Sequence, residues 1–94
     1  MDVKWARSAT KHRISRERSR HGIEHCGLRF ELRPPAGGPA GRARRLVYLG
    51  DDANRVALEV MAIELEDGGL LVIHAMPPRD RYREQYQEAK RWRR

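Results

Sequence analysis

The stretch RLVYLGDDANRVALEVMAIELEDGGLLVIHAM, residues 45–76, decides the expected fold. It contains three apolar runs, residues 45–50, 55–65 and 70–76, which two short polar segments separate. Acidic and amide side chains in the first segment, and two adjacent glycines in the second, favour tight reversals of the chain. Consecutive strands joined by tight turns predict an antiparallel sheet.

The middle run changes its alternation partway along. Its apolar residues fall into two phases: Val56, Leu58 and Val60, then Met61, Ile63 and Leu65. We expect a β-bulge near residues 60–62, because one extra residue moves the alternation from one face of a strand to the other. The run at residues 70–76 is apolar almost throughout, which is typical of a central strand.

The flanking segments supply the other strands and a loop. Residues 2–5 predict a short first strand, and the alternation of apolar and charged residues at 28–33 predicts another. The composition of residues 34–44, PPAGGPAGRAR, is typical of a flexible surface loop.

Three helices are expected outside the strands. Two are N-terminal, at residues 8–13 and 16–26, with Ser15 as a good N-cap for the second and Gly27 as its left-handed stop. The tail, residues 80–93, predicts a C-terminal helix that turns its tyrosines inward.

These elements predict one α+β domain, residues 1–94, in which two N-terminal helices and one C-terminal helix pack on an antiparallel sheet. A chain of 94 residues is too short for a multidomain enzyme. No apolar run approaches the roughly 20 residues that span a bilayer, and the first residues lack the apolar segment of a secretory leader. The single Cys26 cannot form an internal disulfide. We therefore expect a cytoplasmic protein that contacts no membrane.

Charge is the most informative feature of the composition. The net charge is +7, with +8 in residues 1–50, −5 in 51–78 and +4 in 79–94. Only three of the 20 basic residues are lysines, and arginine pairs with phosphate through two parallel hydrogen bonds. A basic chain with positive ends and an acidic middle indicates a polyanionic partner, most often nucleic acid. The alternative is that arginine only keeps the surface solvated.

Three places carry a resemblance to a known family. They are the opening strand that ends at Trp5, the segment KHRISRE at residues 11–17, and the pair IHAM at 73–76 and RDRYREQY at 79–86. In this order, they resemble three elements of the BrnT family: its short first strand, its K-H-G-[VI]-[ST]-x-E-E element, and its I-S-A-R strand followed by an R-x-E-R-x-x-Y helix. That family consists of bacterial toxin ribonucleases of the RelE-like group.

The resemblance implies a toxin endoribonuclease that uses no metal or cofactor and is neutralised by a cognate antitoxin protein. It implies a toxin–antitoxin hetero-oligomer or a homo-oligomer. Three residues depart from the family pattern: Met76 replaces the strand Arg, His74 replaces the Ser, and Arg13 replaces the Gly. If the strand Arg supports the scissile phosphate in the family, Arg79 or Arg83 must take that role here.

RNA is cleaved without a metal when its 2′-hydroxyl attacks the neighbouring phosphate, while the protein moves protons and stabilises the charge on phosphorus. Histidine suits the proton transfers, and arginine suits the charge. The candidate catalytic residues are His12, His74, Arg79, Arg83 and Tyr86. The candidate RNA-binding residues are Lys4, Arg7, Lys11, Arg13, Arg16, Arg20, Arg81 and Lys90.

The same residues also have purely structural interpretations. His74 would be a core histidine bonded to a backbone carbonyl, His12 a cap at the end of the first helix, and Tyr86 a core anchor. His21 and His25 have the spacing of two metal ligands on one helix face, but no third ligand accompanies them, so no metal site is predicted.

Two other functions stay open. One is a nucleic-acid-binding or regulatory module without catalysis, which the Met76 departure favours. The other is a purely protein-binding subunit, whose acidic segment at residues 51–67 would dock a basic partner.

Overall fold

The computed structural model describes residues 2–32 and 44–92, so the loop expected at 34–44 lies outside the described residues except for Arg44. The elements in chain order are β1 (Val3–Trp5), the 3-10 turn η1 (Arg7–Thr10), α1 (Arg16–Glu24), β2 (Cys26–Leu32), β3 (Arg45–Asp51), β4 (Ala57–Glu64), β5 (Leu70–Met76) and α2 (Asp80–Arg91). Neither α-helix in this part of the chain is long and apolar enough to cross a membrane.

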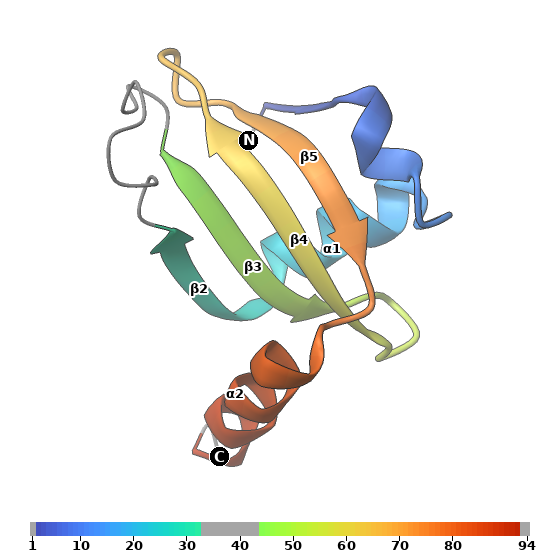
Figure 1. The fold of residues 1–94 in the computed structure, drawn as a ribbon, viewed down its shortest axis with the longest axis vertical. Helices are drawn as coiled ribbons and strands as arrows, with labels where there is room; N and C mark the ends of the chain where they lie inside the picture. The colour runs from blue at the N-terminus through green and yellow to red at the C-terminus, as the bar shows by residue number, and fades with distance from the viewer. Residues whose placement is uncertain (1, 33–43, 93–94) are drawn as a thin grey trace.

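The strands form one mixed sheet in the order β1-β5-β4-β3-β2 (Figure 1). The pairs β2–β3, β3–β4 and β4–β5 are antiparallel, as predicted. β1 instead runs parallel to β5, with Val3 opposite Leu70 and Trp5 opposite Val72. The prediction of a purely antiparallel sheet is therefore wrong. The run of antiparallel strands leaves the outer edge of β5 unpaired, and the N-terminal segment fills that edge in the same direction.

The prediction of two N-terminal helices is also wrong. The described residues contain one α-helix in the N-terminal half and one after the last strand. The first expected helix is replaced by the single turn η1, which is fastened to the sheet. Ala6 N donates to Val72 O at 2.9 Å, and Ser8 Oγ donates to Ile73 O at 2.7 Å. These bonds tie the segment to β5, and the left-handed φ of Arg13, 61°, excludes a right-handed helix that continues through residue 13.

Local backbone geometry sets the ends of α1. Arg13 has a φ of 61°, in the left-handed region that a right-handed helix cannot contain. The helix begins after Ser15, whose hydroxyl accepts a hydrogen bond from Arg18 N at 3.1 Å, as expected of the N-cap. It ends at Glu24, earlier than predicted, and Gly27 lies inside β2 rather than at the end of the helix.

The sheet is apolar on both faces. In Figure 1, α1 lies behind the sheet and α2 lies at its lower end. Buried residues on the α1 side include Ile23, Tyr48, Leu58 and Val60, and those on the α2 side include Val47, Leu49, Tyr82 and Tyr86. This burial on both sides explains the two phases of β4, since each phase faces a different core. The register does shift between Met61 and Ala62, but the extra residue of the bulge is Ile73 in β5.

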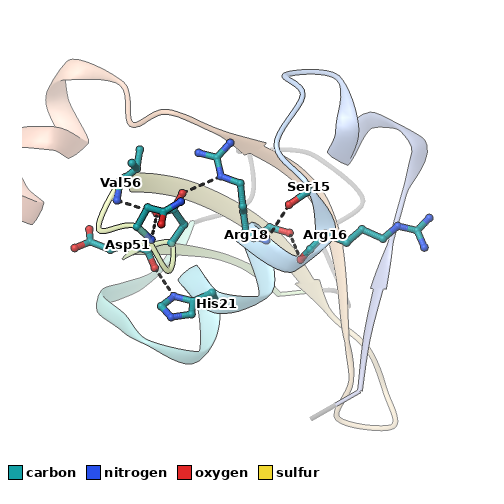
Figure 2. A network of polar contacts seen from close by, with 9 residues as sticks. Ser15, Arg16, Arg18, His21, Asp51 and Val56 are labelled. Atoms are coloured by element: carbon teal, nitrogen blue, oxygen red, sulfur yellow. Dashed lines mark hydrogen bonds and ion pairs between the residues drawn. The ribbon is translucent and has the colours of Figure 1, made fainter.

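Polar contacts fix α1 to the β3–β4 hairpin (Figure 2). Arg18 Nε donates to Asp52 Oδ2 at 2.8 Å, and Asp52 Oδ1 accepts from Val56 N at 2.9 Å. His21 Nδ1 donates to Asp51 O at 2.8 Å. The hydrogen bonds from Val56 and Arg18 lower the pKa of Asp52, because they stabilise its ionised form more than burial disfavours it. The buried Asp52 therefore holds the hairpin turn and the helix together.

Candidate functional site

The site begins where the N-terminal segment lies along β5. The hydrogen bonds from Ala6 and Ser8 hold η1 beside this strand, and the chain then reaches Lys11 and His12. The ring of His12 lies edge-on to the ring of His74, with 5.4 Å between ring centroids and 77° between ring planes. Two histidines 62 positions apart in the sequence are thus in contact.

A buried glutamate lies beside His74. Strand register places Met61 opposite His74 and Glu59 opposite Met76, so these side chains share one face of the sheet. Glu59 is fully buried. His74 Nε2 lies 3.5 Å from Glu59 Oε2 and, within the described residues, it is a buried atom without a hydrogen-bond partner. The alternative in which this nitrogen is bonded to a backbone carbonyl therefore does not describe His74.

Arg79 neutralises the buried glutamate. It is the N-cap residue of α2, and its backbone N donates to Glu59 Oε1 at 3.1 Å. Its Nη2 and Nε donate to Glu59 Oε2 at 2.8 and 3.1 Å. These bonds to a carboxylate raise the pKa of Arg79. The Arg79 side chain is nevertheless 46% exposed, so its charge is held in place while solvent still reaches it.

His74 is held in its neutral form. Burial is the main cause that lowers the pKa of His74, and the positive charges of His12 and Arg79 act in the same direction. The carboxylate of Glu59 opposes them without reversing the shift. At neutral pH this imidazole can accept a proton. His12, Glu59, His74 and Arg79 are called the histidine cluster below.

The other two predicted catalytic residues lie elsewhere on α2. Arg83 is 55% exposed, and its Nη2 donates to Pro78 O at 3.2 Å. Tyr86 is buried among the residues of the α2-side core, and its hydroxyl donates to Asp51 Oδ1 at 2.8 Å. The structure therefore brings together His12, His74 and Arg79, and it gives Tyr86 the contacts of a core anchor.

Most of the predicted RNA-binding residues gather around β1, η1 and the start of α1. These are Lys4, Arg7, Lys11, Arg13, Arg16 and Arg20, called the basic edge below. In the part of the chain that the structure describes, none of the six forms an ion pair. Arg16 and Arg20 lie over the ring of Trp5 at 5.6 and 5.7 Å from its centroid. The charge of this edge is therefore available to an outside anion.

The two predicted RNA-binding residues on α2 have partners within the chain. Lys90 Nζ lies 3.0 Å from Asp51 Oδ1. Arg81 Nη2 donates to the Tyr82 hydroxyl at 2.6 Å, and its guanidinium lies 4.5 Å from the centroid of that ring. The N-terminal cations are consequently the stronger candidates for contact with a polyanion.

Glu59 is the residue that sequence reasoning missed. It alternates with Leu58 and Val60, which is the pattern of a solvent-facing residue on a half-buried strand. The apolar Met61 and Ile63 occupy the same phase as Glu59, however, and that phase is too apolar to face solvent. A lone acidic residue in a buried phase was the available signal.

His21 of α1 and His25, the C-cap residue of that helix, contact each other. The rings of His21 and His25 are stacked with 4.3 Å between centroids. Across residues 2–32 and 44–92, no group of three His, Cys, Asp or Glu side chains is arranged to hold a metal ion.

No family model matches this chain, and no curated protein or solved structure matches it either. The resemblance to the BrnT family therefore stays a prediction from the motifs, and the function is argued from the site.

Proposed function

We propose that this protein is a small endoribonuclease of the toxin–antitoxin type, which cleaves RNA without a metal through its histidine cluster. The observation that carries the proposal is the contact between His12 and His74 beside an arginine that a buried glutamate holds in place. Two imidazoles can carry the two proton transfers of this reaction, and a guanidinium can stabilise the charge on the phosphoryl oxygens.

The proposed reaction uses the two histidines in opposite protonation states. Neutral His74 takes the proton of the RNA 2′-hydroxyl, and the 2′-oxygen forms a bond to the adjacent phosphorus. The bond from phosphorus to the 5′-oxygen breaks, and protonated His12 donates a proton to that leaving oxygen. The products are a 2′,3′-cyclic phosphate and a 5′-hydroxyl. In the transition state the attacking 2′-oxygen and the leaving 5′-oxygen are bonded to the same phosphorus, so the two proton transfers take place close together, as the contact between His12 and His74 requires.

Arg79 stabilises the negative charge that develops on the phosphoryl oxygens. Met76 occupies the position of the family's strand Arg and is the register partner of Glu59 on the neighbouring strand β4. The guanidinium at this place comes instead from Arg79, three residues further on, and Glu59 fixes it there. Glu59 is fully buried, so we assign it as a positioning residue for Arg79 and His74.

The basic edge is the proposed path of the RNA backbone. Its six cations form no ion pairs among the described residues, and Lys11 directly precedes His12 of the histidine cluster. Phosphate neutralisation by such residues gives salt-sensitive binding that does not depend on base sequence. By the resemblance, the protein partner of this enzyme is a cognate antitoxin.

Cleavage of an mRNA in the presence of EDTA tests the proposal. We expect the wild-type protein to cut, and His74→Gln and His12→Gln to lose at least about 100-fold in rate, the size of a lost general acid or base. His25→Gln is the matched control, because His25, the C-cap residue of α1, is an exposed histidine outside the cluster. Intact RNA with the wild-type protein, or equal rates for all the variants, contradicts the proposal.

The runner-up function is a nucleic-acid-binding module without catalysis. It is favoured by the engagement of Arg79 with Glu59 and by Met76 at the position of the family Arg. Binding of RNA that saturates and weakens with salt, without any cleavage, selects this function instead.

A further inference from the structure

Strand β2 forms an open edge of the sheet. The strand order ends on β2, and among the described residues β2 pairs with β3 alone. Figure 1 shows it at the outer side of the sheet, at the opposite edge from β1. An edge strand of seven residues presents unpaired backbone donors and acceptors to another strand.

The sequence of β2 is complementary to itself when it runs antiparallel. Its last five residues read Leu28-Arg29-Phe30-Glu31-Leu32. A two-fold axis at Phe30 places Arg29 opposite Glu31 of a second copy, and Glu31 opposite Arg29. It also places Leu28 opposite Leu32 and Phe30 opposite Phe30. Every cross-strand pair is then apolar with apolar or of opposite charge, which are the pairs that stabilise neighbouring strands.

The side chains of β2 are distributed as this pairing requires. Arg29 and Glu31 are exposed and share a face, since they lie opposite Tyr48 and Leu46 of β3. The apolar residues Leu28, Phe30 and Leu32 are half-buried on the other face. A second strand would extend both faces, with ion pairs on one and apolar contacts on the other.

One way in which edge strands avoid association is to carry charged side chains, especially lysines, which repel the lysines of a second copy. The two exposed charges of β2 have opposite signs. Glu31 already contacts Arg44 Nη2 at 3.1 Å but stays 47% exposed, and an ion pair exposed to this degree contributes little within one chain. The Glu31 carboxylate can therefore also bind an arginine of a second copy.

We propose that β2 pairs antiparallel with β2 of a second copy of this chain, with the two-fold axis at Phe30. The two sheets then form one continuous sheet. In each copy, β1 and β5 lie toward the sheet edge opposite β2, away from the new contact. The histidine cluster and the basic edge would therefore stay open on both copies, and the dimer does not depend on the proposed activity.

Charge reversal tests this register. Sedimentation equilibrium measures the dissociation constant of the wild-type protein, of Arg29→Glu, of Glu31→Arg and of the double variant Arg29→Glu/Glu31→Arg. Because of the two-fold axis, each single change creates two pairs of like charges that lie opposite each other. We therefore expect the dissociation constant of the dimer to rise at least about ten-fold. The double variant recreates both opposite-charge pairs in reversed order, and we expect it to dimerise like the wild type.

Two further reversals control for net charge. Arg55→Glu and Glu66→Arg change exposed residues in the two hairpin turns, away from β2, and we expect wild-type dimerisation from both. Circular dichroism checks that each variant is folded. The double variant loses the same local contacts as the single variants, so restoration by the double change supports pairing between copies. A wild-type protein that is monomeric up to roughly 1 mM, or a double variant as weak as the single ones, overturns the proposal.

Discussion

At the scale of single residues, Glu59 controls the geometry of the candidate site. Its carboxylate is fully buried, and it receives three hydrogen-bonding groups of Arg79 and the nearby ring of His74. A buried charge is tolerated only when it is paired and hydrogen-bonded. The same contacts that make Glu59 acceptable in the core fix Arg79 and His74 relative to each other.

This pairing has a measurable consequence for stability. Arg79→Met leaves the Glu59 carboxylate buried without its cation, and we expect the free energy of unfolding to fall by about 3–5 kcal/mol. The double variant Glu59→Gln/Arg79→Met removes the charge as well, so it should lose less than Arg79→Met alone. Urea denaturation measures both values. If the double variant is the less stable of the two, the ion pair does not hold this region in the way described.

The lowered pKa of His74 makes stability depend on pH. In the unfolded chain a histidine has a pKa near 6.5, and the folded value for His74 lies below this. Between the two values the unfolded state binds more protons, so the free energy of unfolding falls as the pH drops below about 6.5. The effect of His74 on stability is constant above that range.

We therefore expect the wild-type protein to lose more stability than His74→Gln between pH 7 and pH 5. Urea denaturation at several pH values measures the two slopes, and comparing the proteins cancels contributions of the other titratable groups. Parallel slopes would show that His74 is solvated normally in the folded state.

At the scale of elements, the packing of α1 on β3 depends on two glycines that face each other. A Cβ added at Gly50 would overlap the backbone carbonyl of Gly22, whereas a Cβ at Gly22 would meet only ordinary contacts of 3.6 Å or more. This asymmetry matters for the site, because α1 follows directly on the segment that carries His12.

Alanine substitutions at the two positions should act in opposite directions. Gly50→Ala forces the helix off the sheet, and we expect a loss of at least about 1–3 kcal/mol in the free energy of unfolding, as for other overpacked cores. Gly22→Ala replaces a mid-helix glycine without a clash and should be neutral or stabilising by up to about 1 kcal/mol. Thermal denaturation distinguishes the two, and a tolerated Gly50→Ala would mean that helix and strand lie further apart.

Sequence patterns predicted the elements with strong local signals. The meander from β2 to β5, the helix cap at Ser15 and the inward tyrosines of α2 follow from alternation, turn residues and spacing, which are local properties. The parallel pairing of β1 and the single turn at η1 depend on hydrogen bonds to β5. Such long-range bonds leave no periodic trace in the sequence of either segment.

The same contrast between local patterns and long-range contacts applies to the candidate site. Residue chemistry was enough to select His12, His74 and Arg79, but no local pattern reveals that the first two are in contact. Glu59 was missed because its burial and pairing depend on Arg79 and His74, which are distant from it in the sequence.

At the scale of the whole molecule, the fold separates the charges of a basic chain. The acidic segment contributes Asp51, Asp52 and Glu59, which are bound to groups of this chain, while the six cations of the basic edge form no ion pairs among the described residues. The cations of the basic edge thus lie in the segments on either side of His12 of the histidine cluster. This arrangement favours attraction of RNA toward the two histidines.

The end groups of the cleaved RNA test the central claim most directly. A short RNA is incubated with the protein in EDTA, next to the same RNA with a 2′-deoxynucleotide at the cut position, and the products are identified by mass spectrometry. Attack by the 2′-hydroxyl predicts 2′,3′-cyclic phosphate and 5′-hydroxyl ends, with no cut at the deoxynucleotide. Products with 5′-phosphate ends, or equal cutting of both RNAs, would contradict the role assigned to His12 and His74.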